Sequence, residues 1–553
     1  MKKIICLILA LILCIGILAG CGEKKEEAPA EEETNKMDAF EQKNEEKKSE
    51  EKKDEAKPDE TKPAPDEQKE VKYQDTIVRL MMDKVNKVST IDIGGRCMLM
   101  GEVWNMCYDT LINLSSDFKE YTPCLATEWD TEDYQHFHFK LREGVKFHNG
   151  EPFTADDVLF TYEIGCSSES AGTSLATRCA QIESVEVLND YEINMTLKQA
   201  NYDWLYEMAT ILGFPIVNRE AIEADREAGA MIGTGPWKIT EFVSGDHIVY
   251  ERNDDYFDEL PPTKKVIFRY ISEVTARNIM VENGEADSSV LNEADIAKYD
   301  NDPNYVIDYK FNSSCGYLSF NTQRPNTSDY NFRMAVAYAV NVKEMIDIAL
   351  NGYGKAQPNS TLWGMGTAYY NESIPLIEQD LEKAKEYLAK SSYDGGKVEI
   401  VATLGYTQSV AQVVMAQMQA IGIDAYVTCV DNATLSQRGR WDNNDIDILV
   451  LQQMMGPLGK DINNCLTPNS DYNKAKWINE EAAALAEKAL YEPDGEERQA
   501  DYYRIQEIMF EEMPYFPTYH VGIWALERAG VGGVNLYPNA NNDFSMVYRI
   551  IPD

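Results

Sequence analysis

The most constraining pattern in the chain is LREGVKFHNGEPFTADDV at residues 141–158. Gly144 and Gly150 flank a short Val-Lys-Phe stretch, as expected of tight turns around a short strand. Thr154 precedes Ala-Asp-Asp, which predicts a helix N-cap with acids in the first helical turn. Residues 135–140, just before, alternate polar and apolar side chains and predict a half-buried strand. These residues therefore have scaffold roles, and none is expected to be catalytic.

The same pattern closely resembles the signature of the extracytoplasmic solute-binding proteins, family 5, which serve dipeptide, oligopeptide and nickel ABC importers. Further matches follow in the family's order, from about residue 77 to the C-terminus. They are IGTGPW at 232–237, ERNDDYF at 251–257, YLSFN at 317–321 and EMPYFP at 512–517.

The resemblance implies an α/β chain with a two-lobed periplasmic-binding-protein-like fold of type II and an extra subdomain inserted in lobe I. The expected boundaries assign residues 74–115, 232–312 and 525–553 to lobe I, 116–231 to the inserted subdomain and 313–524 to lobe II. Ligands of such proteins lie between the lobes, where closure excludes water and strengthens each polar contact.

The N-terminus predicts export and anchorage. Two lysines precede an apolar run at residues 4–18, which is short for a membrane-spanning helix but suits a secretory signal. The run ends in Leu18-Ala-Gly-Cys21, which resembles a bacterial lipobox. Residues 1–20 are therefore expected to be a lipoprotein signal peptide, with Cys21 lipidated and the protein held on the extracytoplasmic face of the cell membrane. A short transmembrane anchor with a chance cysteine is the alternative.

Residues 21–73 are expected to form a disordered tether. They are rich in Glu, Lys, Ala and Pro and contain almost no aromatic or β-branched residues, so they bury too little surface to offset chain entropy. Local helix is possible because Glu and Lys recur four residues apart.

Charge excludes one class of partner. The 553 residues contain 93 Asp and Glu against 52 Lys and Arg, a net charge of −41, which repels nucleic acid. The hydrophobic share of 44% and charged share of 26% are ordinary for globular proteins, which excludes wholesale disorder and a multi-pass membrane protein.

The family's peptide binders anchor the ligand's α-amino group with an Asp shortly after a strand that residues 445–451 match. Counting without a gap places Gly456 at that position, and the nearest acid is Asp461. The resemblance therefore implies either that the amino clamp is absent, which favours a blocked or modified peptide, or that a gap restores Asp461 to the role.

Several residues are candidates for ligand contact. Arg96, on a loop that lines the cleft in relatives, is able to pair bidentately with a carboxylate or phosphate, or is a solvated surface arginine. Gln452 and Gln453 supply amide donors and acceptors, and Met454 gives adaptable apolar surface. A structural hinge role is the alternative for the two residues at 519 and 520. The candidate set is Arg96, Cys97, Tyr317, Gln452, Gln453, Met454, Tyr519 and His520.

Neither a metal site nor a disulfide framework is predicted. His136 and His138 point the same way from one strand, but no third ligand lies at a suitable spacing, which favours a solvated strand face. Cys166 and Cys179 are the best local pair for a disulfide, with free, mostly buried thiols as the alternative.

The resemblance implies a monomeric solute-binding component of an ABC importer. It would capture a peptide or peptide-like solute and deliver it to permease subunits driven by a separate ATPase, since no P-loop pattern occurs in the chain. A nickel chelate or another small anionic solute is the alternative ligand. A lipid-anchored secreted hydrolase is the alternative of another class, disfavoured because neither G-x-S-x-G nor H-E-x-x-H occurs. No cofactor or catalytic residue is expected.

Overall fold

A computed structural model describes most of the chain. The described residues are 36–55, 71–92, 100–115, 120–311, 315–364, 367–453, 462–537 and 542–551. The signal segment and Cys21 lie outside them. The chain divides into two compact units, Met1–Pro58 and Asp59–Asp553. The first contains helix α1 (Lys36–Glu55), which lies within the predicted tether and carries the Glu and Lys spacing that supports local helix.

One 12-stranded sheet runs through the second unit. Its first half, which we call the lobe I sheet, has β1 at its centre, paired in parallel with β10 on one side and β11 on the other. Four of the six side chains of β1, Arg79 among them, are buried, as expected of a parallel strand covered on both faces. In order, these strands are β11 (Ser288–Val290), β1 (Thr76–Met81), β10 (Lys265–Tyr270), β9 (His247–Arg252) and β8 (Trp237–Val243).

The other half, the lobe II sheet, also has a parallel centre. Strand β15 pairs in parallel with β16 and β17, and four of its six side chains are buried, as is usual for parallel strands. Helices α13 (Tyr406–Ala420), α11 (Val342–Ala349) and α10 (Tyr330–Ala339) bury their apolar faces in the core of this lobe. The strands are β16 (Ala425–Val430), β15 (Val398–Thr403), β17 (Ile448–Gln453) and β13 (Cys315–Phe320).

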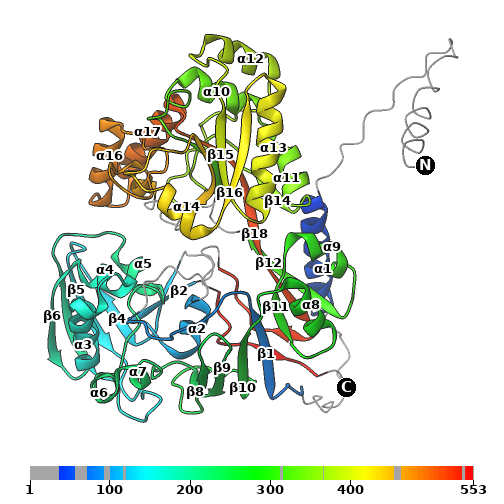
Figure 1. Cartoon of the computed structure of the whole chain (residues 1–553). Helices are drawn as coiled ribbons and strands as arrows, with labels where there is room; N and C mark the ends of the chain where they lie inside the picture. The colour runs from blue at the N-terminus through cyan, green and yellow to red at the C-terminus, as the bar shows by residue number, and fades with distance from the viewer. Residues whose placement is uncertain are drawn as a thin grey trace. The chain divides into compact units, whose positions relative to one another are not determined.

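Strand β18 (Tyr515–Arg528) joins the two halves (Figure 1). Its first part pairs with β13 and β14 (Gly354–Ala356), and its second part pairs with β11 and β12 (Tyr305–Phe311). The register with β13 shifts between Gly316 and Tyr317. Both sheets therefore share one continuous strand.

A separate four-stranded antiparallel sheet lies within the range predicted for the inserted subdomain. The LREGVKFHNGEPFTADDV pattern belongs to it. Gly144 and Gly150 have positive φ angles of 80° and 92°, and the Asp157 carboxylate accepts a hydrogen bond from the Thr154 backbone N–H at 3.0 Å. The predicted turns and helix start are thus confirmed. The elements are β4 (Ala126–Asp130), β5 (His136–Leu141), β7 (Glu192–Leu197), β6 (Ile182–Asn189) and the covering helix α3 (Ala155–Gly165).

The remaining elements cover the sheets or connect them, and no helix of the described residues is both long enough and apolar enough to cross a membrane. They are α2 (Met100–Cys107), β2 (Ile112–Leu114), β3 (Tyr121–Pro123), α4 (Ser174–Cys179), α5 (Trp204–Ala209), α6 (Arg219–Ala224), α7 (Arg226–Gly229), α8 (Val274–Glu282), α9 (Ile296–Tyr299), α12 (Leu381–Lys390), α14 (Asn432–Arg438), α15 (Asn463–Leu466), α16 (Glu480–Leu490), α17 (Glu496–Glu512), β19 (Val531–Gly532) and β20 (Tyr548–Arg549).

Candidate ligand-binding site

The carboxyl ends of the parallel strands in lobe II present two polar side chains. Because β15 and β17 are parallel, their carboxyl ends lie at the same edge of the sheet, where open α/β sheets hold their ligands. After β15 the chain turns at Gly405 (φ 99°), a left-handed conformation that suits glycine, and enters α13 with Tyr406. The Tyr406 hydroxyl donates a hydrogen bond to Oε1 of Gln452, near the end of β17, at 2.6 Å.

Lobe I contributes an acid to the same region. Glu293 follows β11, so it lies beyond the carboxyl end of a strand parallel to β1. Burial raises the pKa of the Tyr406 phenol, and the negative charge of Glu293 raises it further. The charge of Glu293 also raises the pKa of Tyr519, after burial and Tyr406. The charge of a lobe I carboxylate therefore acts on two tyrosines, one in lobe II and one in β18.

An aromatic cluster surrounds Trp524, the residue that adjoins Glu293. The ring of Trp524, in β18, stacks on Tyr309 with centroids 5.3 Å apart and meets Tyr353 edge-on at 6.0 Å. Burial raises the pKa of the Glu293 carboxyl, and the Trp524 indole opposes that shift. We call Glu293, Tyr406, Gln452, Tyr519 and Trp524 the hinge site.

Tyr519 leaves one polar atom of the hinge site unpaired. Its side chain is fully buried, and its ring meets Tyr406 edge-on with centroids 6.4 Å apart. Among the described residues its hydroxyl has no hydrogen-bond partner. An unpaired buried hydroxyl costs free energy that a polar ligand atom or a water would recover.

Two of the candidate residues from the sequence belong to the framework of lobe II instead. Tyr317 is 2% exposed and packs edge-on against Tyr515 in the core, and burial raises its pKa well above the ordinary value. His520, also 2% exposed, donates a hydrogen bond through Nε2 to Oε1 of Gln357. The amide of Gln357 in turn donates to the carbonyl of Thr361 at 2.7 Å. Both candidate side chains thus have structural partners within lobe II.

The other candidates lie at the margin of the described structure. Gln453 pairs through its backbone with Cys315 at the end of β17. Arg96, Cys97 and Met454 lie outside the described residues, as do Gly456 and Asp461. Of the eight candidates, the structure brings Gln452 and Tyr519 together.

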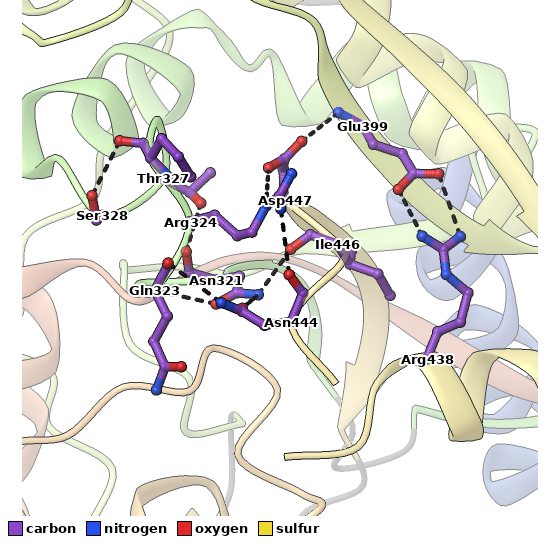
Figure 2. Close-up of polar contacts among 11 residues, drawn as sticks. Asn321, Gln323, Arg324, Thr327, Ser328, Glu399, Arg438, Asn444, Ile446 and Asp447 are labelled. Atoms are coloured by element: carbon purple, nitrogen blue, oxygen red, sulfur yellow. Dashed lines mark hydrogen bonds and ion pairs between the residues drawn. The ribbon is translucent and has the colours of Figure 1, made fainter. Parts of the chain in front are cut away.

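The two acids at the start of the predicted strand at 445–451 have structural roles, as Figure 2 shows for Asp447. Asp447 accepts hydrogen bonds from Nε of Arg324 at 2.8 Å and from the Glu399 backbone N–H at 2.9 Å. Arg438 pairs with the carboxylates of Glu399 at 2.8 Å and Asp445 at 3.1 Å. These carboxylates are therefore committed to holding β15, β17 and α14 together.

Lobe I also holds a polar cavity of about 360 Å³ next to the end of α2. Asp109 lies in its wall, where it accepts hydrogen bonds from the hydroxyls of Thr234 at 2.8 Å and Tyr256 at 3.2 Å. Burial raises the pKa of Asp109 to about 6 against these two donors. No lysine, arginine or histidine occurs among the described residues of the wall, so the cavity suits a hydroxyl or a positively charged group. The residues that line the cavity are Asn105, Tyr108, Asp109, Thr110, Asn113, Leu114, Ser115, Thr122, Ala209, Thr210, Ile211, Pro236, Tyr256, Asn535, Tyr537, Asp543 and Ser545.

Metal and thiol chemistry have little support in the described part of the chain. It contains no group of three or more His, Cys, Asp or Glu side chains placed to hold a metal ion. The two histidines of β5 pair with carboxylates, His136 with Asp133 at 2.7 Å and His138 with Glu192 at 2.8 Å. Cys166, which is exposed, and Cys179, which is buried, are both free thiols.

The two lobes, the shared strand and the polar residues at the carboxyl ends of both sheets define a type II periplasmic binding protein. The solved structure of the ABC transporter substrate binding protein CtaP from Listeria monocytogenes has this fold. It matches with a TM-score of 0.77 at 24% identity, over 86% of this chain and 100% of that chain.

The chain belongs to the bacterial extracellular solute-binding proteins, family 5. The family model, described as "family 5 Middle", matches residues 120–463. A nickel-binding periplasmic protein of Escherichia coli is 27% identical over 79% of this chain and 88% of its own length. A di/tripeptide-binding protein of Pseudomonas aeruginosa is 26% identical over 79% and 88%. The resemblance found in the sequence is therefore confirmed, and the protein is an extracellular solute-binding protein.

Glu293 and Tyr406 were not among the residues selected from the sequence. Tyr406 had a usable local signal, since a buried strand, a glycine and a helix start place its side chain at the carboxyl edge of the sheet. Glu293 had none, because its proximity to Tyr406 depends on how the two lobes pack.

Proposed function

We propose that the protein captures a peptide or peptide-like solute between its two lobes and delivers it to the permease subunits of an ABC importer. The observation that carries this proposal is that Tyr406 and Gln452, at the carboxyl ends of β15 and β17, share a hydrogen bond of 2.6 Å beside the buried Tyr519 of the strand that both sheets share. A solute held there would touch both lobes at once, so its binding would favour closure. A separate ATPase would drive transport, and the protein itself would act by binding and not by catalysis.

The hinge site suits an amide-rich ligand. Tyr406 and Gln452 together offer a hydroxyl and an amide, which match the carbonyl and N–H groups of a peptide backbone. The stacked rings of Trp524, which is 2% exposed, and Tyr309 give this region an apolar backing. Glu293 adds a carboxylate able to pair with a ligand ammonium, whether or not Asp461 takes that role.

The nickel chelate stays a second candidate because a nickel-binding protein is among the relatives. Such a ligand would bring its own donor atoms. The described residues offer the outer surface of such a chelate single carboxylates, hydroxyls and amides. They contain no group of three or more His, Cys, Asp or Glu side chains that could hold a bare metal ion.

Isothermal titration would test the proposal with four probes: a tripeptide, its N-acetylated form, nickel–histidine and a small dicarboxylate. We expect Tyr406→Phe to weaken binding of the tripeptide about tenfold, the usual worth of one hydrogen bond. Tyr330→Phe, an exposed tyrosine of the same lobe, is the matched control and should leave binding unchanged. Equal affinity of the wild type and Tyr406→Phe would place the ligand elsewhere.

The acetylated probe decides how the ligand's N-terminus is bound. Loss of affinity on acetylation that Asp461→Asn abolishes would assign the clamp to Asp461, and loss that Glu293→Gln abolishes would assign it to Glu293. Equal binding of both peptides would favour the blocked or modified peptide that Gly456 at the amino-anchor position suggests. Binding of nickel–histidine alone would favour the chelate.

We also propose that the mature protein is a monomer anchored by lipid at Cys21 on the extracytoplasmic face of the membrane. The lipobox-like Leu18-Ala-Gly-Cys21 and the polar composition of residues 22–72 support this.

A further inference from the structure

An ion pair joins two segments that lie 295 residues apart in the chain. Nη1 of Arg498 donates to Oδ1 of Asp203 at 3.0 Å, and Nη2 donates to Oδ2 at 2.7 Å, which makes the pair bidentate. The two side chains are 2% and 5% exposed. Asp203 directly precedes α5, in the range of the inserted subdomain, and Arg498 lies in the first turn of α17, in lobe II.

Aromatic rings of lobe II complete the surroundings of Arg498. Its guanidinium lies 5.4 Å from the ring of Tyr369 and 5.9 Å from that of Tyr502, and these two rings stack with centroids 4.9 Å apart. Such a position over aromatic faces favours a cation. Burial alone would lower the pKa of the Arg498 guanidinium, but Asp203 together with Tyr369 and Tyr502 raises it overall, so the guanidinium stays charged.

The two partners belong to different hydrophobic cores. Trp204, next to Asp203, is buried in the core that contains β5 and α3, whereas Tyr502 and Ile505, on the helix of Arg498, are buried in a core of lobe II. Each core has its own apolar contacts without the ion pair. If one partner is substituted, the charge of the other is left unpaired. Burying that unpaired charge costs free energy only while the two surfaces are in contact, because their separation exposes it to water.

We infer that Asp203 and Arg498 form a latch that holds the inserted subdomain against lobe II when the lobes are closed. The latch lowers the free energy of the closed form and leaves the folding of either lobe unchanged. A ligand bound between the lobes is retained longer in a protein that is more often closed. This inference goes beyond the proposed function and is independent of the ligand's identity.

Hydrogen–deuterium exchange of the full chain tests the latch without any ligand. In Asp203→Asn we expect faster exchange at residues 201–206 and at 496–502, and unchanged exchange in the strands of both sheets. Arg504→Gln is the matched control, since Arg504 lies on the same helix but is exposed and pairs with Glu481 at 2.9 Å within lobe II. It should leave residues 201–206 unchanged. The reciprocal variant Asp203→Arg with Arg498→Asp should restore slow exchange at both segments.

Two results would overturn the latch. Unchanged exchange at 496–502 in Asp203→Asn would mean that the pair does not hold the surfaces together. Faster exchange throughout both sheets would mean that the pair supports the fold itself.

Titration adds a second readout. Whichever of the tripeptide and nickel–histidine binds the wild type should bind Asp203→Asn about 10-fold or more weakly, because the closed form is populated less. Equal affinities would contradict the role in ligand retention. Failure of both probes to bind the wild type would count against the proposed function alone, since the exchange experiment uses neither.

Discussion

Burial strongly affects the pKa of one carboxyl group in lobe I, that of Glu527. Glu527 of β18 is fully buried, and its Oε1 accepts a hydrogen bond from the Ser288 hydroxyl at 2.9 Å. Burial raises its pKa to about 8, opposed by the positive charge of Arg79 and reinforced by the negative charges of Asp308 and Asp287. The folded protein therefore holds a proton on Glu527 at neutral pH that the unfolded chain releases.

This difference predicts a pH dependence of stability. The folded pKa of about 8 lies above the unfolded value of about 4.5, so the contribution of Glu527 is complete at low pH and is lost as the pH rises through 8. The melting temperature of the wild type should fall between pH 6 and pH 9 by more than that of Glu527→Gln, which keeps the neutral shape. Glu481→Gln, at an exposed position, should behave as the wild type. Parallel curves for the wild type and Glu527→Gln would show that the carboxyl is already ionised at pH 6.

Thiol reactivity is a second prediction for single residues. Cys166 is exposed, while Cys179 is buried and burial raises its pKa well above the ordinary value. Because the thiolate is the reactive form, iodoacetamide should label Cys166 in the native protein and Cys179 only after unfolding. Peptide mass spectrometry would measure both. A Cys166–Cys179 disulfide in freshly purified protein would contradict the free thiols.

Among the elements, β13 packs a glycine, Gly316, against a ring of β18. A Cβ at Gly316 would lie 2.6 Å from the ring of Tyr519, and the ring has no room to move because it is fully buried. We expect Gly316→Ala to destabilise the protein by about 1–3 kcal/mol through overpacking. Chemical denaturation would measure this.

A double-mutant cycle can show whether the destabilisation by Gly316→Ala comes from a clash with the Tyr519 ring or from the backbone of β13. Combined with Tyr519→Leu, which removes the ring, Gly316→Ala should cost much less than it does alone. Additive costs would show that the strain arises from the backbone of β13 and not from Tyr519.

Local elements were easier to predict from the sequence than the residues of the site. The turns at Gly144 and Gly150 and the helix start at Thr154 depend on neighbouring residues, and the structure confirms them. His520 was chosen for its place beside a proline-rich crossing, yet its exposure depends on β14, a strand that pairs with β18 from more than 150 residues away. The proximity of Glu293 to Tyr406 depends in the same way on packing between lobes, which no local pattern reports.

At the scale of the whole molecule, the chain divides into a short unit, Met1–Pro58, and a large body. The body contains separate cores on either side of the ion pair between Asp203 and Arg498. This division suits a protein whose lobes move relative to each other while each stays folded.

Anchorage can be tested on the full-length protein. Cys21→Ser should give a protein that is shed or left as precursor, because serine offers no thiol for the lipid. Membrane fractionation with an antibody to the body would measure the distribution, and Cys166→Ser is the control for a change in thiol number. Persistent membrane attachment of a processed Cys21→Ser protein would argue against the lipobox.

Strand β18 also bears on when the protein folds. It begins at Tyr515 in a chain of 553 residues, yet both sheets need it, since β11 and β12 of one half and β13 and β14 of the other pair with it. During synthesis the strands of both halves therefore lack this partner until Tyr515–Arg528 has been made. An exported protein benefits from this delay, because a translocation channel passes an unfolded chain. The last long strand to be made would then complete both lobes together on the far side of the membrane.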